Sequence, residues 1–239
     1  MMARQQPADS QSIVRGTSGP WTDLGLTLPV FVGYHLGVVF FPIRNAADVV
    51  TRELVALADH SLMAYGALTL ALGGLFVSVL MMLGRGHTLR WERFAFVAFE
   101  GIAYAILMRL VASYVVGRLL LAAAPASATE SLVMALGAGF YEELAFRVGL
   151  FGLGAKLLNV VVPSLTSMGR LLRKLAWAAV AAAVFSAWHY VGDLGDPFEL
   201  RSFLFRWVAG IVFTAIYAVR GFAPVVWTHT LYDIWVLAL

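Results

Sequence analysis

The chain has 239 residues, of which 61% are hydrophobic and 13% are charged, and its formal net charge is +3. Soluble domains contain about 45–50% apolar and about 25% charged residues, so this composition excludes a water-soluble enzyme and a nucleic-acid-binding protein. The mean hydropathy of +0.82 indicates an integral membrane protein. The sequence contains no cysteine, which excludes disulfides, thiolate chemistry and cysteine-bound metals.

A short polar segment precedes a series of long apolar runs. We expect residues 1–21, which are rich in Gln, Ser, Gly and Pro, to form a mobile tail. Residues 22–239 are expected to form a single transmembrane domain. A helix needs about 20 apolar residues to cross a bilayer. The runs predict an all-α, polytopic bundle of about seven spans, with an error of one either way, at 22–43, 61–84, 94–122, 130–155, 174–191, 199–219 and 222–239.

The positive charges of the loops predict an orientation. Lys and Arg are frequent in the amino-terminal tail and near 85–93, 156–174 and 220. The alternate loops carry only Arg44, Arg52 and Arg201. Positively charged loops stay on the cytoplasmic side, so we expect the amino terminus in the cytoplasm and the carboxyl terminus outside.

The fourth apolar run contains the densest group of charges, Glu142, Glu143 and Arg147. Each charge within a span costs about 2.5–3.5 kcal/mol on insertion scales, so it requires an explanation. Glu143 and Arg147 are four residues apart and can pair on one helix face, whereas Glu142 points about 100° away. A paired carboxylate stays ionised and structural, and an unpaired neighbour is suited to act as a general base. A structural ion network that braces the helices is the alternative interpretation.

Two histidines lie in later apolar runs, each with a side chain of interest at helical spacing. His189 follows Phe185 by four residues, and Asp233 follows His229 by four, so each pair shares a helix face. A single histidine in a span more often bonds neighbouring helices, and His35, which has no partner at helical spacing, is expected to serve packing. Zinc binding by Glu142, His189 and His229 requires the fold to bring them together, and the H-E-x-x-H spacing is absent. Without metal, Glu142 would activate a water that one imidazole positions, while the other imidazole and Asp233 would stabilise an oxyanion.

The three patterns Glu142-Glu143-x-x-x-Arg147, Phe185-x-x-x-His189 and His229-x-x-x-Asp233 resemble, in this order, the CAAX-protease and bacteriocin-processing family of intramembrane endopeptidases. The resemblance covers residues 130–239. It implies a catalytic site of Glu142, Glu143, Arg147, His189, His229 and Asp233, with no cofactor and with zinc not favoured. Glu142 would activate water with the help of His189, Glu143 and Arg147 would brace the site, and His229 and Asp233 would stabilise the oxyanion. Two departures from the family pattern are present. Asp233 stands where the family commonly has Asn, and the stretch before the last motif, which is glycine-rich in the family, contains few glycines here, with Gly210 the clearest.

The resemblance implies an intramembrane endopeptidase that hydrolyses a peptide bond of a membrane-anchored or membrane-inserted protein. Its partners would be that protein substrate and the lipid bilayer, without nucleic acid, in the plasma membrane of a bacterium or archaeon. One alternative is a non-catalytic membrane scaffold or immunity protein that retains the polar network. A proton- or ion-coupled transporter ranks last, because the sequence has no pair of broken helices in two matching halves.

Overall fold

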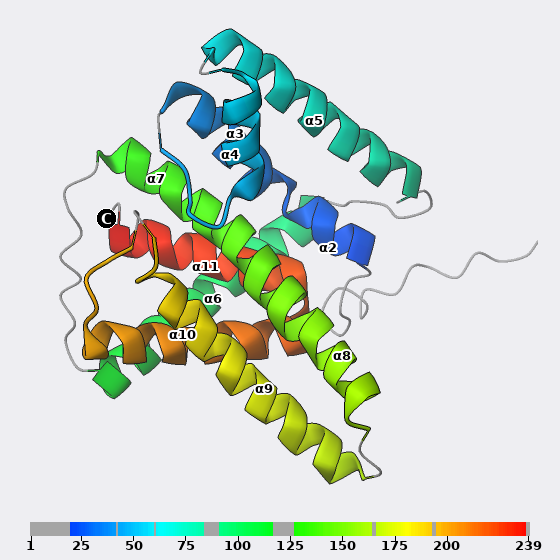
Figure 1. The fold of residues 1–239 in the computed structure, drawn as a ribbon, viewed down its shortest axis with the longest axis vertical. Helices are drawn as coiled ribbons and strands as arrows, with labels where there is room; N and C mark the ends of the chain where they lie inside the picture. Colours follow the sequence, from blue (N-terminus) through cyan, green and yellow to red (C-terminus); the bar gives the residue numbers. More distant parts are fainter. Residues whose placement is uncertain are drawn as a thin grey trace, which may run out of the picture.

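The computed structural model describes residues 20–41, 43–59, 61–83, 91–116, 127–163, 166–192 and 195–237, and the secondary structure within these ranges is entirely helical. The helices cross one another in a bundle (Figure 1). In chain order they are α2 (Pro20–Leu26), α3 (Leu28–Phe40), α4 (Val49–Leu57), α5 (Leu62–Leu83), α6 (Trp91–Val116), α7 (Ala128–Gly137), the π-helix η1 (Ala138–Leu153), α8 (Gly154–Val161), α9 (Ser167–Trp188), α10 (Leu200–Arg220) and α11 (Phe222–Leu237). The predicted all-α fold is confirmed. Most of the expected tail, residues 1–19, lies outside the described residues.

Five of the described helices are long and apolar enough to cross a membrane: 62–79 in α5, 91–111 in α6, 128–161 in α7 to α8, 167–188 in α9 and 200–220 in α10. The first predicted span is divided at Thr27, whose hydroxyl donates to the Leu24 carbonyl. Pro29 then lies in the first turn of α3, where a missing N–H costs nothing. The last predicted span is the 16-residue α11. The sequence therefore overestimates the length of the spans at both ends of the chain.

The fourth predicted span is one continuous helix of 34 residues formed by α7, η1 and α8. It begins at a capping box in which the Ser127 hydroxyl accepts from the Glu130 backbone and the Glu130 carboxylate accepts from the Ser127 backbone. Its middle sixteen residues are wound as a π-helix. A π-helical turn holds more residues than an α-helical turn, so successive side chains diverge by less than about 100°. Glu142 and Glu143 are both buried in the bundle.

The junction between α10 and α11 is fixed from α2. Gly221 has a φ of 99°, in the left-handed region that favours glycine. The Asp23 carboxylate accepts the Phe222 backbone N–H at 2.7 Å. This bond satisfies a donor at the start of α11 and sets the direction in which α11 enters the bundle.

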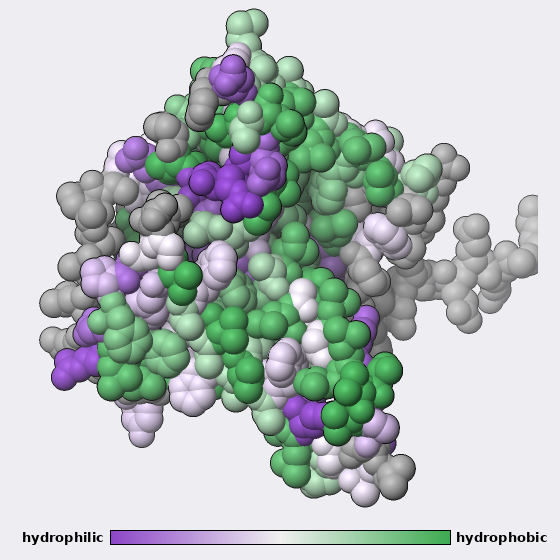
Figure 2. Space-filling model, viewed as in Figure 1, coloured by the Kyte–Doolittle hydropathy of each residue, from purple (hydrophilic) through white to green (hydrophobic). Residues whose placement is uncertain are grey.

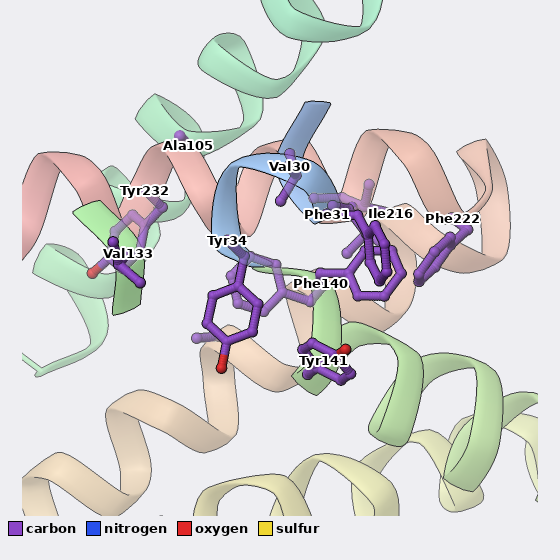
Figure 3. Close-up of a cluster of buried hydrophobic side chains, with 14 of the residues drawn as sticks. Val30, Phe31, Tyr34, Ala105, Val133, Phe140, Tyr141, Ile216, Phe222 and Tyr232 are labelled. Atoms are coloured by element: carbon purple, nitrogen blue, oxygen red, sulfur yellow. The ribbon is translucent and has the colours of Figure 1, made fainter. Parts of the chain in front are cut away.

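The hydrophobic core lies where α3, η1, α10 and α11 meet, and Figure 3 shows part of it. Phe31, Tyr34, Phe140 and Tyr141 contribute neighbouring rings. Gly139 lets η1 approach α11 closely, because a Cβ at this position would lie 1.9 Å from the Thr230 hydroxyl oxygen. The core thereby holds the helix that carries Glu142 and Glu143 directly against the helix that carries His229.

Large apolar side chains cover much of the outer surface, as the green areas of Figure 2 show. On α5 and α6, Met63, Leu70, Phe99 and Leu110 are between 63% and 88% exposed. Such side chains favour lipid over water by about 25 cal/mol for each Å² of apolar surface. The molecule is an integral membrane protein, and these faces lie toward lipid.

Candidate active site

A cavity of about 720 Å³ opens among η1, α9, α10 and α11. Four of the six predicted site residues line it: Glu142, His189, His229 and Asp233. Glu143 and Arg147 do not line the cavity and are buried beside it, at 0% and 1% exposure. The fold thus brings together side chains from three helices that are far apart in the sequence.

The two carboxylate oxygens of Glu142 have different surroundings: one accepts a hydrogen bond from Asn45, and the other faces His189. Its Oε1 accepts a hydrogen bond of 2.8 Å from the Asn45 side-chain amide. Its Oε2 is buried without a hydrogen-bond partner among the described residues and lies 3.7 Å from His189 Nε2. That separation is too long for a direct hydrogen bond. The carboxylate is therefore oriented, with one oxygen left for a small molecule between it and the imidazole.

His189 is the C-cap residue that follows α9, and its orientation is set by contacts with that helix. Nδ1 lies 2.9 Å from the Phe185 carbonyl oxygen. A carbonyl only accepts, so Nδ1 carries a proton, and Nε2 faces Glu142 across the cavity. The Phe185 ring packs edge-on against the imidazole at 5.0 Å between centroids. The i, i+4 spacing recognised in the sequence thus gives both a hydrogen bond and a ring contact.

Glu143 joins two of the predicted motifs. Its Oε2 lies 3.1 Å from Arg147 Nε, and its Oε1 accepts from His229 Nδ1 at 2.6 Å. The Arg147 guanidinium also lies over the Phe185 ring, 4.2 Å from its centroid. Buried charges need partners of this kind, because removing one partner costs about 3–5 kcal/mol. The pairing of Glu143 with Arg147 follows from helical spacing, whereas the contact with His229 joins residues 86 positions apart.

His229 is held between two carboxylates and a ring. Beyond the bond to Glu143, its Nε2 lies 3.4 Å from Asp233 Oδ2. The imidazole stacks on Phe213, with 4.4 Å between centroids. A carboxylate or amide on one nitrogen fixes the tautomer and the ring orientation. His229 consequently presents only its Nε2 edge, together with Asp233, to the cavity.

Asn45 is a site residue that the sequence did not reveal. It lies in the connection between α3 and α4, 97 positions from Glu142. Tyr34 and Asp48 hold this connection: the Tyr34 hydroxyl donates to Asp48 Oδ2 at 2.7 Å and accepts the Asn45 N–H at 3.0 Å. No periodicity relates a loop amide to a distant helix. The local signal is limited to two polar residues, Asn45 and Asp48, beside apolar runs.

His35 has a partner from another helix. Its Nε2 lies 2.7 Å from the Tyr141 hydroxyl, beside Glu142 in the chain. Both side chains are buried. This contact agrees with the packing role expected for His35 and ties α3 to η1 next to the catalytic candidates.

Within the described ranges, no three His, Asp or Glu side chains converge so as to hold a metal ion. His229 directs Nδ1 at Glu143, and His189 directs Nδ1 at a carbonyl. These bonds leave Nε2 of both rings toward the cavity, and among the described residues Glu142, His189 and His229 are not placed as a group that could hold a metal ion.

The fold and the cavity define an integral membrane protein with a buried site of carboxylates and imidazoles. Residues 124–235 match the family model described as Type II CAAX prenyl endopeptidase Rce1-like. For this carboxyl-terminal part of the chain, the resemblance seen in the sequence is confirmed. The comparisons with curated proteins and with solved structures gave no match. Asn45 lies outside the matched segment.

Proposed function

We propose that the chain is an intramembrane endopeptidase in which Glu142 activates the hydrolytic water without a metal ion. The match of residues 124–235 to the CAAX prenyl endopeptidase family model supports the peptidase class and a membrane-associated protein substrate. The observation that carries the mechanism is the pair formed by Glu142 Oε2 and His189 Nε2, which face each other at 3.7 Å in the cavity.

Two acceptors at this separation can share one water. An oxygen placed about 2.8 Å from each atom is compatible with the 3.7 Å gap. Neither the Glu142 carboxylate nor the unprotonated His189 Nε2 can donate, so the water donates one hydrogen to each. Its lone pairs are then directed away from both side chains, toward a substrate carbonyl carbon in the cavity.

The reaction divides into attack and collapse. Glu142 takes a proton as the water oxygen bonds to the carbonyl carbon, and it returns that proton to the leaving amine. The carbonyl oxygen becomes an oxyanion, which the Nε2–H of a doubly protonated His229 stabilises. Glu143 and Asp233 balance the charge of that imidazolium, and Arg147 balances Glu143. Each of the six predicted residues then has a role.

The decisive test compares wild-type protein with Glu142→Gln and with the control Glu53→Gln, an exposed carboxylate on α4. Glu142→Gln retains the shape of the side chain and the contact with Asn45, but it cannot accept the proton. We expect the rate of peptide cleavage, followed by mass spectrometry of new protein termini in membranes, to fall at least about 100-fold. The control should cleave at the wild-type rate.

A Glu142→Gln protein that folds and cleaves normally would overturn the mechanism. Absence of cleavage by both proteins against all membrane substrates, with an intact biological phenotype in the mutant, would favour the non-catalytic scaffold. The metal-free part is tested separately. Wild-type protein dialysed against EDTA should retain its cleavage rate and contain less than one zinc ion per chain by elemental analysis, and a loss restored by zinc would contradict it.

A further inference from the structure

A second cavity of about 780 Å³ lies among α2, η1, α8, α9 and α10. Its lining is largely apolar and includes Leu144, Val148 and Phe151 from η1 and Trp177 from α9. Glu142 does not line it, because it belongs to the other cavity. The second cavity is thus separate from the candidate active site, and η1 forms a wall of both.

Cations gather on this cavity. Lys156, Arg170, Arg173 and Lys174 line it, and they include both lysines of the sequence. Asp23 is the one carboxylate among its described lining residues, and it accepts the backbone N–H of Phe222. The cations are therefore in excess: Lys156 lies in α8, and Arg170, Arg173 and Lys174 lie in the first half of α9.

The cationic groups are directed by local contacts. The Lys174 amine lies 5.8 Å from the centroid of the Phe151 ring, which itself lines the cavity. Arg173 donates to the Val162 carbonyl and to the Asn159 side chain, and these bonds join the end of α8 to the start of α9. The positive groups are consequently held beside the apolar lining at one end of two membrane-spanning segments.

We propose that this cavity binds an anionic phospholipid. Acyl chains fit the apolar lining of Leu144, Val148 and Phe151, and the phosphate fits the cations Lys156 and Lys174. Basic residues at the ends of transmembrane helices attract anionic headgroups. The bilayer supplies this ligand to a cavity at the end of a span, and the charge excess selects an anionic over a zwitterionic headgroup. The proposal does not depend on the catalytic mechanism.

The two lysines allow a direct test, because an amine-acylating reagent can modify only Lys156, Lys174 and the amino terminus. Purified full-length protein is titrated with phosphatidylglycerol or with phosphatidylcholine, and acylation of each amine is followed by mass spectrometry. Met168→Lys supplies the control amine: Met168 is 62% exposed at the start of α9 and does not line the cavity. We expect phosphatidylglycerol to slow acylation of both native lysines at least about threefold and to leave the control lysine nearly unchanged.

Several outcomes would overturn the proposal. Equal protection by phosphatidylcholine would mean that the cavity does not select the headgroup. Equal protection of the control lysine would mean a general surface effect. A second measurement uses the variant Lys156→Gln/Lys174→Gln, with Arg52→Gln on the exposed face of α4 as control. By native mass spectrometry, the double variant should retain at least about fivefold less phosphatidylglycerol than the control, and equal retention by correctly folded proteins would refute the site.

Discussion

Asn45 reaches Glu142 from a loop and acts on one oxygen only. Its amide donates to Oε1 at 2.8 Å, which leaves Oε2 toward His189. Its own carbonyl oxygen accepts the Ala47 N–H at 2.8 Å, so the same side chain also shapes the loop. Asn45 is therefore proposed as a positioning residue, and the two functions of its side chain can be separated by mutation.

We predict that Asn45→Ala lowers kcat for peptide cleavage by about 10- to 100-fold with little change in KM. A misoriented Glu142 slows the chemical step but does not weaken substrate binding. Asn45→Asp keeps the acceptor for Ala47 but removes the donor to Glu142 and adds a like charge. Steady-state kinetics should show at least as large a loss for Asn45→Asp. Full activity of Asn45→Asp would restrict the role of Asn45 to loop structure.

At the residue scale, the sequence revealed what lies within one helical turn and missed what lies across the bundle. The pairs Glu143–Arg147 and His229–Asp233 are four residues apart, and their side chains lie 3.1 Å and 3.4 Å apart. Helical period alone predicts such neighbours. The contact between His229 and Glu143 and that between Asn45 and Glu142 depend on how helices cross, which spacing does not encode.

At the scale of elements, the sequence predicted which segments are helical better than how they are wound or divided. The long apolar runs correspond to α5, α6, α9 and α10. The π-helical winding of η1 had no signature in the apolar pattern, and it changes the angle between Glu142 and Glu143. The expected separation of these carboxylates by about 100° is that of an α-helix and is wrong for this segment.

The helices η1 and α11 approach each other closely at Gly139, so a larger residue at this position should destabilise the fold. A methyl group at Gly139 would lie 1.9 Å from Thr230 Oγ1 and 2.9 Å from the Thr230 backbone nitrogen. We expect Gly139→Ala to destabilise the folded protein by about 1–3 kcal/mol, measured as a lower melting temperature in detergent.

Gly73→Ala is the matched control for Gly139→Ala. Gly73 lies within α5, and a Cβ there meets nothing within 4 Å. Alanine favours a helix by about 1 kcal/mol over glycine, so this change should leave the melting temperature unchanged or raise it. Equal melting temperatures for Gly139→Ala and Gly73→Ala would show that η1 and α11 can move apart without a loss of stability.

At the scale of the whole molecule, the candidate active site and the basic cavity lie toward opposite ends of α9. Asp196, Pro197 and Glu199, which follow α9, line the catalytic cavity. Arg170 and Arg173, near its start, line the basic cavity. The predicted orientation puts the basic end in the cytoplasm, so the catalytic cavity is expected to open on the other side.

The absence of cysteine allows this orientation to be tested in the natural background. A 22-residue α9 is about 33 Å long and spans the hydrocarbon core. Met168→Cys should react with a membrane-impermeant maleimide only after permeabilisation, and Glu199→Cys should react in intact cells. The reverse result would invert the orientation, and labelling of both from one side would show that α9 does not cross.

The position of Asn45 also has a consequence for how the chain can be divided. The matched segment 124–235 contains Glu142, His189 and His229, but the amide that orients Glu142 comes from residue 45. A fragment limited to the matched segment would keep Glu142, His189 and His229 but would lose the hydrogen bond that orients Glu142. The amino-terminal part would keep the amide without a carboxylate to hold. The proposed catalytic centre therefore draws on both parts of the chain, and we expect a chimera that exchanges the carboxyl-terminal segment to need a compatible loop between α3 and α4 as well.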